Sequence, residues 1–281
     1  MRLKKMGKKR ILLLGLLLLF SSAAIAGRMY GSNLCKQEGF HCQKVKRNQS
    51  WRSLWPDDGE RDIVMRINRM NTQLYQGLTI AVPDNLETAD IMDFAPFPKQ
   101  IQSTGEKLVV VDPRQYAWGA YDQDGSLVRW GPASAGSDWC KDLDEPCHTH
   151  EGVFKIFLLG SSSCYSTKFP LPDGGAPMPY CMYFNNGQAL HGEPNGLPGY
   201  NASHGCVRLY VNDAEWLRYD FVEGPNDYNN YRGTTVDVLS YSTDEAPVEE
   251  KRTKKRKVSS DDDLDSDSET YRDSEQSYPD I

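Results

Sequence analysis

A histidine and a cysteine stand fifteen residues apart in this 281-residue chain, and their spacing constrains the fold more than any other feature. His191 is followed by a loop rich in Gly, Pro and Asn, and then by the run SHGCVRL at 203–209. We expect a strand at 206–211. His191 then lies on a preceding strand, and the flexible loop can bring its imidazole across to the thiol.

These residue types predict acyl-transfer chemistry. A thiol is a good nucleophile only as thiolate, and an imidazole can take its proton and return it to a leaving amine. His191 and His204 are both candidates, since His204 lies two residues before Cys206 on the same strand face. Amides at Gly205 and Cys206 could face a developing oxyanion, and Arg208 could hold a substrate carboxylate or a neighbouring acid. The alternative is that Cys206 is a half-cystine and the histidines are ordinary loop residues.

The region from Lys107 onward has the sequence texture of a mainly β domain. Strand-like runs cover 108–111, 115–121, 127–130, 153–159, 182–184, 206–211 and 235–241. Asp124-Gly125 between two of these runs predicts a hairpin. One helix is expected to begin at Asn212, with Glu215 as its capping-box partner.

The pair His191-Gly192 followed by SHGCVRL resembles the signature of the L,D-transpeptidase (YkuD-type) family, and that motif is highly specific. The similarity extends over residues 106–241. The segments that carry it are 107–112, 131–136, 149–154, 178–184 and 189–192. His150 departs from the family pattern, which has Thr-Pro-x-Gly-x-Phe where this chain has Thr149-His150-Glu151-Gly152-Val153-Phe154.

The resemblance implies a β-sandwich catalytic fold and names its site. Cys206 would be the nucleophile and His191 the base, with the Gly192 carbonyl orienting the imidazole. Further residues are expected to line the site: Ser203, His204, Gly205 and Arg208. We add Tyr183 as an aromatic wall of the substrate groove. The chemistry requires no metal and no cofactor.

The N-terminus indicates export. Residues 1–10 are basic, 11–20 are apolar, and small residues follow up to Ala26. This order predicts a signal peptide at 1–26 and a periplasmic, envelope-bound or secreted protein. The alternative is a permanent membrane anchor, but the apolar run is shorter than the roughly 20 residues of a span. The formal net charge of −7 becomes −13 when six basic residues leave with the signal, which argues against nucleic-acid binding.

Seven cysteines in an exported chain leave at least one unpaired. Six cysteines allow 15 pairings, so the sequence alone does not decide the connectivity. Pairing by proximity gives 35–42, 140–147 and 164–181, and leaves Cys206 free. A zinc site at Cys140, Cys147, His148 and His150 is the weaker interpretation, because the spacing fits no standard pattern.

Two segments flank the predicted catalytic domain. Residues 43–85 resemble a LysM domain, a strand–helix–helix–strand module that binds the N-acetylglucosamine-containing glycan of peptidoglycan; the alternative is a helical spacer. The matching features are Ser50-Trp51 at the first helix, Ile67-Asn68 near the end of the second helix, and a last strand at 77–83. Apolar residues at helical spacing over 63–70 predict that second helix. Residues 86–105 are expected to be a linker. Residues 243–281 are charged, nearly without apolar residues, and are predicted to be disordered.

The resemblance therefore predicts an exported enzyme that forms 3→3 crosslinks between peptidoglycan stem peptides. Its partners would be those peptides and the wall glycan; the oligomeric state stays open. With water as acceptor, the same residues make an L,D-carboxypeptidase, and with a protein lysine they anchor proteins to the wall. A non-catalytic peptidoglycan-binding protein and a secreted factor that acts on a host through its tail also fit the sequence.

Overall fold

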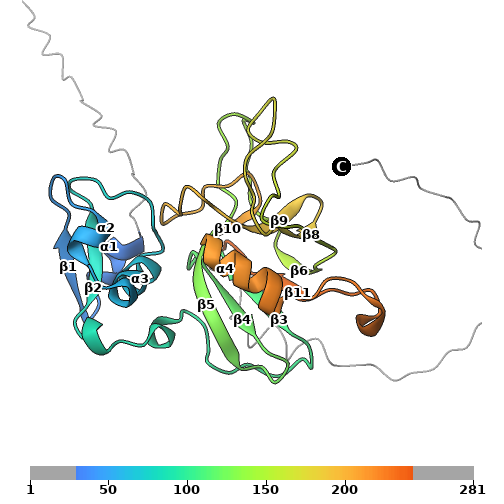
Figure 1. Cartoon of the computed structure of the whole chain (residues 1–281), viewed down its shortest axis with the longest axis horizontal. Coiled ribbons are helices and arrows are strands. Elements are labelled where there is room, and N and C mark those ends of the chain that lie inside the picture. The colour runs from blue at the N-terminus through green and yellow to red at the C-terminus, as the bar shows by residue number, and fades with distance from the viewer. Residues whose placement is uncertain (1–29, 243–281) are drawn as a thin grey trace, which may run out of the picture.

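The computed structural model describes residues 30–242, which form a small N-terminal module (30–85) and a larger β domain (106–242) (Figure 1). The predicted signal peptide and the charged tail lie outside the described residues. Within the described part, none of the helices has the length and apolar character needed to cross a membrane.

The N-terminal module is built on a two-stranded antiparallel sheet with short helices between its strands. Its elements are α1 (Tyr30–Leu34), β1 (Phe40–Lys44), α2 (Trp51–Leu54), α3 (Asp58–Ile67) and β2 (Thr79–Pro83). Ser50 caps α2 by accepting a hydrogen bond from the Ser53 amide. Asp57 caps α3 in the same way through the amides of Gly59 and Glu60, which satisfies backbone donors that a helix start leaves free.

The apolar pattern of this module behaves as predicted at the helix. Val64 and Ile67 on α3 are buried, whereas Met70 lies beyond the end of the helix. Trp51 and Trp55 complete the small core, with ring centroids 5.6 Å apart. The order strand, helix, helix, strand is the one expected from the sequence.

The connecting segment 86–105 packs against the β domain. It forms two 3₁₀ turns, η1 (Leu86–Thr88) and η2 (Ile91–Phe94). Phe97 and Ile101 then enter a core beneath the sheet, and the indole of Trp130 donates to the Ile91 carbonyl at 2.9 Å. The segment therefore contributes to the core of the β domain.

The β domain contains one sheet of nine strands in the order β6-β11-β3-β4-β5-β10-β9-β8-β7. The strands are β3 (Leu108–Asp112), β4 (Ala117–Tyr121), β5 (Leu127–Ser134), β6 (Gly152–Lys155), β7 (Leu158–Leu159), β8 (Met182–Asn185), β9 (Gln188–Gly192), β10 (Val207–Leu209) and β11 (Thr235–Val238). The pairs β10–β9 and β11–β3 are parallel and the rest antiparallel. The expected hairpin at Asp124-Gly125 joins β4 to β5.

The sheet curls so that its two halves share one hydrophobic core. Phe154 on β6 and Phe184 on β8 meet with ring centroids 5.6 Å apart, although these strands lie in opposite halves of the sheet order. The mainly β fold is thus confirmed. The expected two-sheet sandwich is replaced by a single curled sheet, because β5 and β10 pair and join the halves.

A helix closes the shared core. It consists of α4 (Val211–Trp216) and a π-helical turn, η3 (Leu217–Phe221), and it lies against the strands in Figure 1. Ala214, Leu217 and Phe221 point into the core. The predicted capping box is wrong: the cap residue is Tyr210 and makes no side-chain cap. Glu215 instead accepts a hydrogen bond from the Tyr180 hydroxyl at 2.8 Å.

Candidate active site

The cysteine pairing leaves one thiol for chemistry. The structure contains the disulfides Cys35–Cys42, Cys140–Cys147 and Cys164–Cys181, which confirms the pairing by proximity. Cys206 is the free cysteine of the described residues, which include all seven. The interpretation of Cys206 as a half-cystine is therefore wrong.

The strand register places Cys206 and His191 on the same face of the sheet. β10 runs parallel to β9 with Val207 opposite Leu190 and Arg208 opposite His191. Val207 and Leu190 are fully buried in the shared core. Because side chains alternate along a strand, the opposite face carries His191, Cys206 and Arg208. The sequence prediction that a neighbouring strand supplies the histidine is confirmed.

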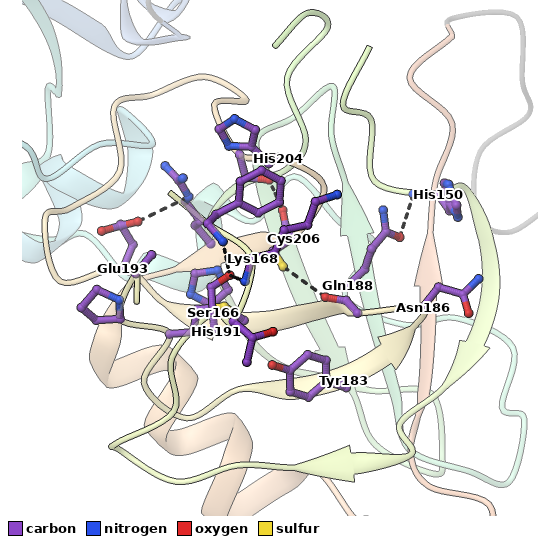
Figure 2. A pocket seen from close by; sticks show the side chains of 18 residues that line it. His150, Ser166, Lys168, Tyr183, Asn186, Gln188, His191, Glu193, His204 and Cys206 are labelled. Carbon is purple, nitrogen blue, oxygen red and sulfur yellow. Dashed lines mark hydrogen bonds and ion pairs between the residues drawn. The ribbon is translucent and has the colours of Figure 1, made fainter. Parts of the chain in front are cut away.

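This face opens into a pocket of about 480 Å³, within the range of small-molecule sites (Figure 2). Strands β8 and β9, the 203–208 segment and the loop between Cys164 and Cys181 all contribute to its wall. The lining residues are His150, Ser166, Thr167, Lys168, Phe169, Ala176, Pro177, Met178, Tyr183, Asn186, Gly187, Gln188, His191, Glu193, Ser203, His204, Cys206 and Arg208.

His191 is buried and held as a single tautomer. Its Nδ1 lies 2.8 Å from the Gly192 carbonyl oxygen, and since a carbonyl only accepts, Nδ1 must carry the proton. Nε2 is therefore the unprotonated nitrogen. Burial, with a smaller contribution from the charge of Arg208, lowers the pKa of His191 to about 4 against the opposing effects of the Gly192 hydrogen bond and Glu193. At neutral pH this side chain is a neutral base.

The half-buried thiol of Cys206 is protonated in the same conditions. Burial raises its pKa, although a backbone hydrogen bond from Ala189 and the charge of Arg208 act in the opposite direction. The sulfur donates to the Gly187 carbonyl at 3.7 Å. Among the described residues, Cys206 forms no hydrogen bond to His191. The raised pKa of the thiol and the lowered pKa of the imidazole make both groups neutral at rest.

Ser203 organises the turn that leads into Cys206. Its hydroxyl donates to the Cys206 carbonyl and accepts from the Gly205 amide at 3.0 Å. The Gly205 amide is thus already engaged, and the expected oxyanion role of that group is not supported. The Gly205 carbonyl accepts a hydrogen bond of 2.9 Å from the buried hydroxyl of Thr149.

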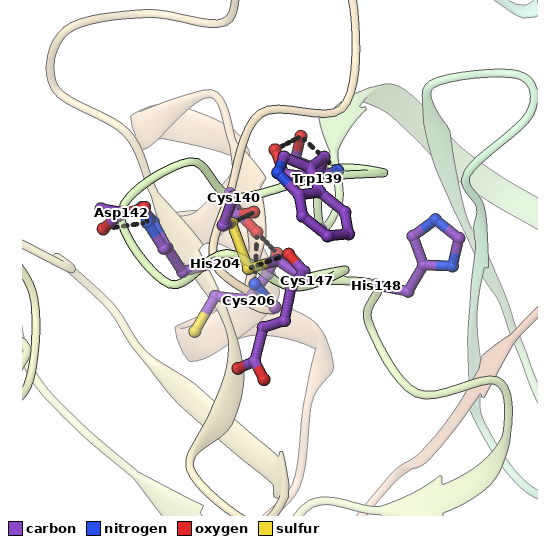
Figure 3. Close-up of a disulfide and its surroundings, with 12 residues drawn as sticks. Trp139, Cys140, Asp142, Cys147, His148, His204 and Cys206 are labelled. Carbon is purple, nitrogen blue, oxygen red and sulfur yellow. Dashed lines mark hydrogen bonds and ion pairs between the residues drawn. A yellow bond between two sulfur atoms is a disulfide. The ribbon is translucent and has the colours of Figure 1, made fainter.

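His204 lies at the rim of the pocket. Its Nε2 is 2.9 Å from both carboxylate oxygens of Asp142 (Figure 3). Its ring stacks on Phe169 with ring centroids 4.3 Å apart. The His204 contact lowers the pKa of Asp142. These interactions tie His204 to the two disulfide-closed loops, and none of those described involves Cys206. This geometry fits a residue that shapes the rim better than a second base.

The charged groups of the pocket are only partly paired. Arg208 forms an ion pair with Glu193, with Nε and Oε2 3.3 Å apart. The sequence suggested either a substrate carboxylate or a neighbouring acid as the partner of Arg208, and the structure contains the neighbouring acid. Lys168 has no ion pair within residues 30–242; its ammonium lies 5.1 Å from the Phe169 ring centroid. Lys168 therefore leaves the pocket with an uncompensated positive charge.

Several lining residues were not predicted. Glu193 could have been found, because it directly follows His191-Gly192 and faces Arg208. Nothing in the local sequence around Lys168 and Phe169 indicates a role in the site, since the tertiary fold alone brings their loop to the pocket. Tyr183 was predicted and lines the pocket; burial, and then the nearby Cys206, raise its pKa.

The donor groups do not form a convincing metal site. The cluster of possible ligands in the described part of the chain is Cys140, Asp142 and His204. Cys140 is bonded to Cys147, so its sulfur is not a free thiolate ligand. The same disulfide overturns the zinc interpretation of Cys140, Cys147 and the following histidines.

A family model agrees with the motif. Residues 106–238 match the family model of the L,D-transpeptidase catalytic domain (YkuD), and no curated protein matches the chain. Among solved structures, an L,D-transpeptidase from Xylanimonas cellulosilytica is 26% identical over 59% of this chain and 74% of its own, with a TM-score of 0.43. One from Stackebrandtia nassauensis is 24% identical over 52% of this chain and 61% of its own, with a TM-score of 0.39. L,D-transpeptidase 3 from Mycobacterium tuberculosis, in complex with a faropenem-derived adduct, is 18% identical over 60% and 77%, with a TM-score of 0.36.

Proposed function

We propose that this protein, whose residues 106–238 match the L,D-transpeptidase catalytic domain, is an exported enzyme that forms 3→3 crosslinks between peptidoglycan stem peptides. The observation that carries the proposal is the register of β9 and β10. With it, the free thiol of Cys206 and the buried neutral imidazole of His191 lie on the same face of the sheet and line one pocket.

The first half of the reaction is acylation of Cys206. Its sulfur attacks the carbonyl that links the third residue of a tetrapeptide stem to the terminal D-Ala. The thiol proton passes to Nε2 of His191, which gives it to the leaving amine of D-Ala. A thioester joins the enzyme to the shortened stem, and D-Ala departs.

The second half transfers the stem to an acceptor. The side-chain amine of a diamino acid in another stem attacks the thioester, and His191 takes up the proton that this amine loses. The new amide is the 3→3 crosslink, and the sulfur leaves and recovers its proton. Water in place of the amine gives an L,D-carboxypeptidase, and a protein lysine gives wall anchoring.

Export and glycan binding complete the proposal. Three disulfides suit an oxidising compartment, in agreement with the predicted signal peptide. The strand–helix–helix–strand order of the N-terminal module supports a LysM-like role in holding the enzyme on wall glycan.

The decisive experiment is mass spectrometry of the mature protein after incubation with a carbapenem, whose strained lactam is an acyl donor for a thiolate. We expect one covalent adduct on the wild type and none on Cys206→Ala. Absence of the adduct, or its persistence in Cys206→Ala, would overturn the enzyme and favour a non-catalytic wall-binding protein.

Purified tetrapeptide stems then identify the acceptor. A crosslinked dimer supports transpeptidation, whereas accumulation of the tripeptide alone identifies an L,D-carboxypeptidase. Deletion of residues 243–281 should leave both products unchanged; loss of activity would implicate the tail.

A further inference from the structure

The N-terminal module contacts the chain on both sides of the Cys206 strand. Just beyond α3, the Asn71 side-chain oxygen accepts a hydrogen bond of 2.6 Å from the Leu197 amide. The backbone N–H of Asn71 donates to the Leu197 carbonyl at 3.1 Å. Met70 and Pro198 form an isolated antiparallel β-bridge. Leu197 is fully buried. The loop 193–203, which joins His191-Gly192 to Ser203, is thus fastened to the module in its middle.

The second contact follows the Cys206 strand. Asp213 on α4 is completely buried and receives two hydrogen bonds from Arg66 of α3, at 2.7 and 3.0 Å. Arg129 of β5 adds a third at 2.8 Å. Arg66 and Asn71, five residues apart, therefore contact the chain on either side of Ser203–Leu209.

The fit of the loop on the module is close. Gly196 has a φ of +81°, and a Cβ at this position would lie 2.8 Å from the Asn71 side-chain oxygen. The same loop begins with Glu193, whose carboxylate pairs with Arg208 and accepts from Asn195. A displaced loop would therefore disturb groups that line the pocket.

We propose that Asn71 of the N-terminal module is a positioning residue for the Cys206–His191 pair. The module is then part of the framework of the active site, in addition to any binding role of its own. Small displacements of reacting groups are costly, since about 1 Å of misplacement can reduce a rate on the order of 100-fold. The inference rests on the proposed function only in taking Cys206 as the reactive group.

The test uses the full mature chain and two independent readouts of Cys206. One is the second-order rate constant for acylation by a carbapenem, and the other is the rate of alkylation by iodoacetamide as a function of pH. For Asn71→Ala we expect acylation about 10-fold slower and an altered alkylation profile, because the loop loses its anchor. Asn71→Asp keeps the acceptor oxygen, so its acylation rate constant should stay within about threefold of the wild-type value.

A second variant approaches the contact from the other side. Gly196→Ala pushes against Asn71 while leaving every module residue in place, and we expect a similar decrease. Two changes elsewhere in the module serve as controls. Gly39→Ala alters a glycine with a φ of +85° and open space around it, and Asn85→Ala removes an exposed side chain without a cap hydrogen bond.

The outcomes separate the two proposals. A wild type that fails to react with the carbapenem would contradict the transpeptidase, and the alkylation profiles would still decide the role of Asn71. Unchanged rate constants for the folded fraction in both Asn71→Ala and Gly196→Ala would overturn the positioning role. Thermal unfolding measured in parallel identifies loss of folded protein, which lowers the reacting fraction without changing its rate constant.

Discussion

His204 and Phe169 stack on each other with ring centroids 4.3 Å apart. This contact joins the segment that leads to Cys206 to the loop closed by Cys164 and Cys181, and the loop forms one wall of the pocket. His204 is also paired with Asp142 of the Cys140–Cys147 loop. Both disulfide-closed loops thus meet at one imidazole.

We expect Phe169→Ala to weaken substrate binding while leaving the thiol intact. Loss of the stack frees the pocket wall, and an aromatic pair contributes about 1 kcal/mol, so KM for a tetrapeptide stem should rise about fivefold. The rate of iodoacetamide alkylation at Cys206 should not change. Tyr165→Ala removes an exposed aromatic of the same loop and is the matched control. Equal effects of the two substitutions on KM would contradict a specific role for the stack.

The pH dependence of stability should report the burial of His191. Its pKa in the folded protein is about 4, below the value of 6.5 expected in the unfolded chain. Between these values the unfolded state binds more protons, so the contribution of neutral His191 is complete above pH 6.5. It is lost as the pH falls toward 4, and amounts to about 3 kcal/mol.

Chemical denaturation of the wild type and His191→Gln between pH 4 and 7 measures this term. The wild type should lose stability more steeply than the variant as the pH falls. Parallel curves would show that His191 titrates normally in the folded protein and is not the buried neutral base described above.

The sequence predicted the parts of the site that depend on local pattern. The two-residue spacing of Cys206 and Arg208 put both side chains on one face of a strand, and the loop after His191 allowed that histidine to lie on a neighbouring strand. Proximity was enough for the disulfides because each pair closes a short loop. Lys168 and Asp142 were missed because long-range packing brings Lys168 to the pocket and Asp142 to His204 at its rim.

Two errors have a common physical origin. The Gly205 amide was expected to face an oxyanion, and Glu215 was expected to cap a helix. Each group is engaged by a partner other than the expected one: the Ser203 hydroxyl accepts from the Gly205 amide, and the Tyr180 hydroxyl donates to Glu215. Local sequence patterns show what a group can do but not which partner will engage it.

Thr149 is predicted to stabilise the turn before Cys206. Its fully buried hydroxyl accepts from the Gly136 amide at 3.0 Å and donates to the Gly205 carbonyl at 2.9 Å. Thr149→Val keeps the shape but leaves both backbone groups unpaired, which should cost about 2 kcal/mol in the free energy of unfolding. Thr149→Ser retains the hydroxyl and should lose less than half as much. Denaturation midpoints measure both, and similar losses in the two variants would indicate that packing, not hydrogen bonding, is responsible.

Lys168 is expected to favour acyl donors that end in a free carboxylate. Glu193 is the acidic residue of the pocket wall and is paired with Arg208, so the Lys168 ammonium is the positive charge left over. Because this side chain is exposed, the attraction is modest: Lys168→Ala should raise KM about two- to fivefold for a stem with a free terminal carboxylate. Lys168→Arg keeps the charge and should retain most of the affinity.

A stem that ends in a carboxamide is the control substrate, and its KM should change little in either variant. Added salt should raise the KM of the wild type for the free-acid stem only. An equal rise in KM for both stems in Lys168→Ala would mean that the side chain acts through contact and not through charge.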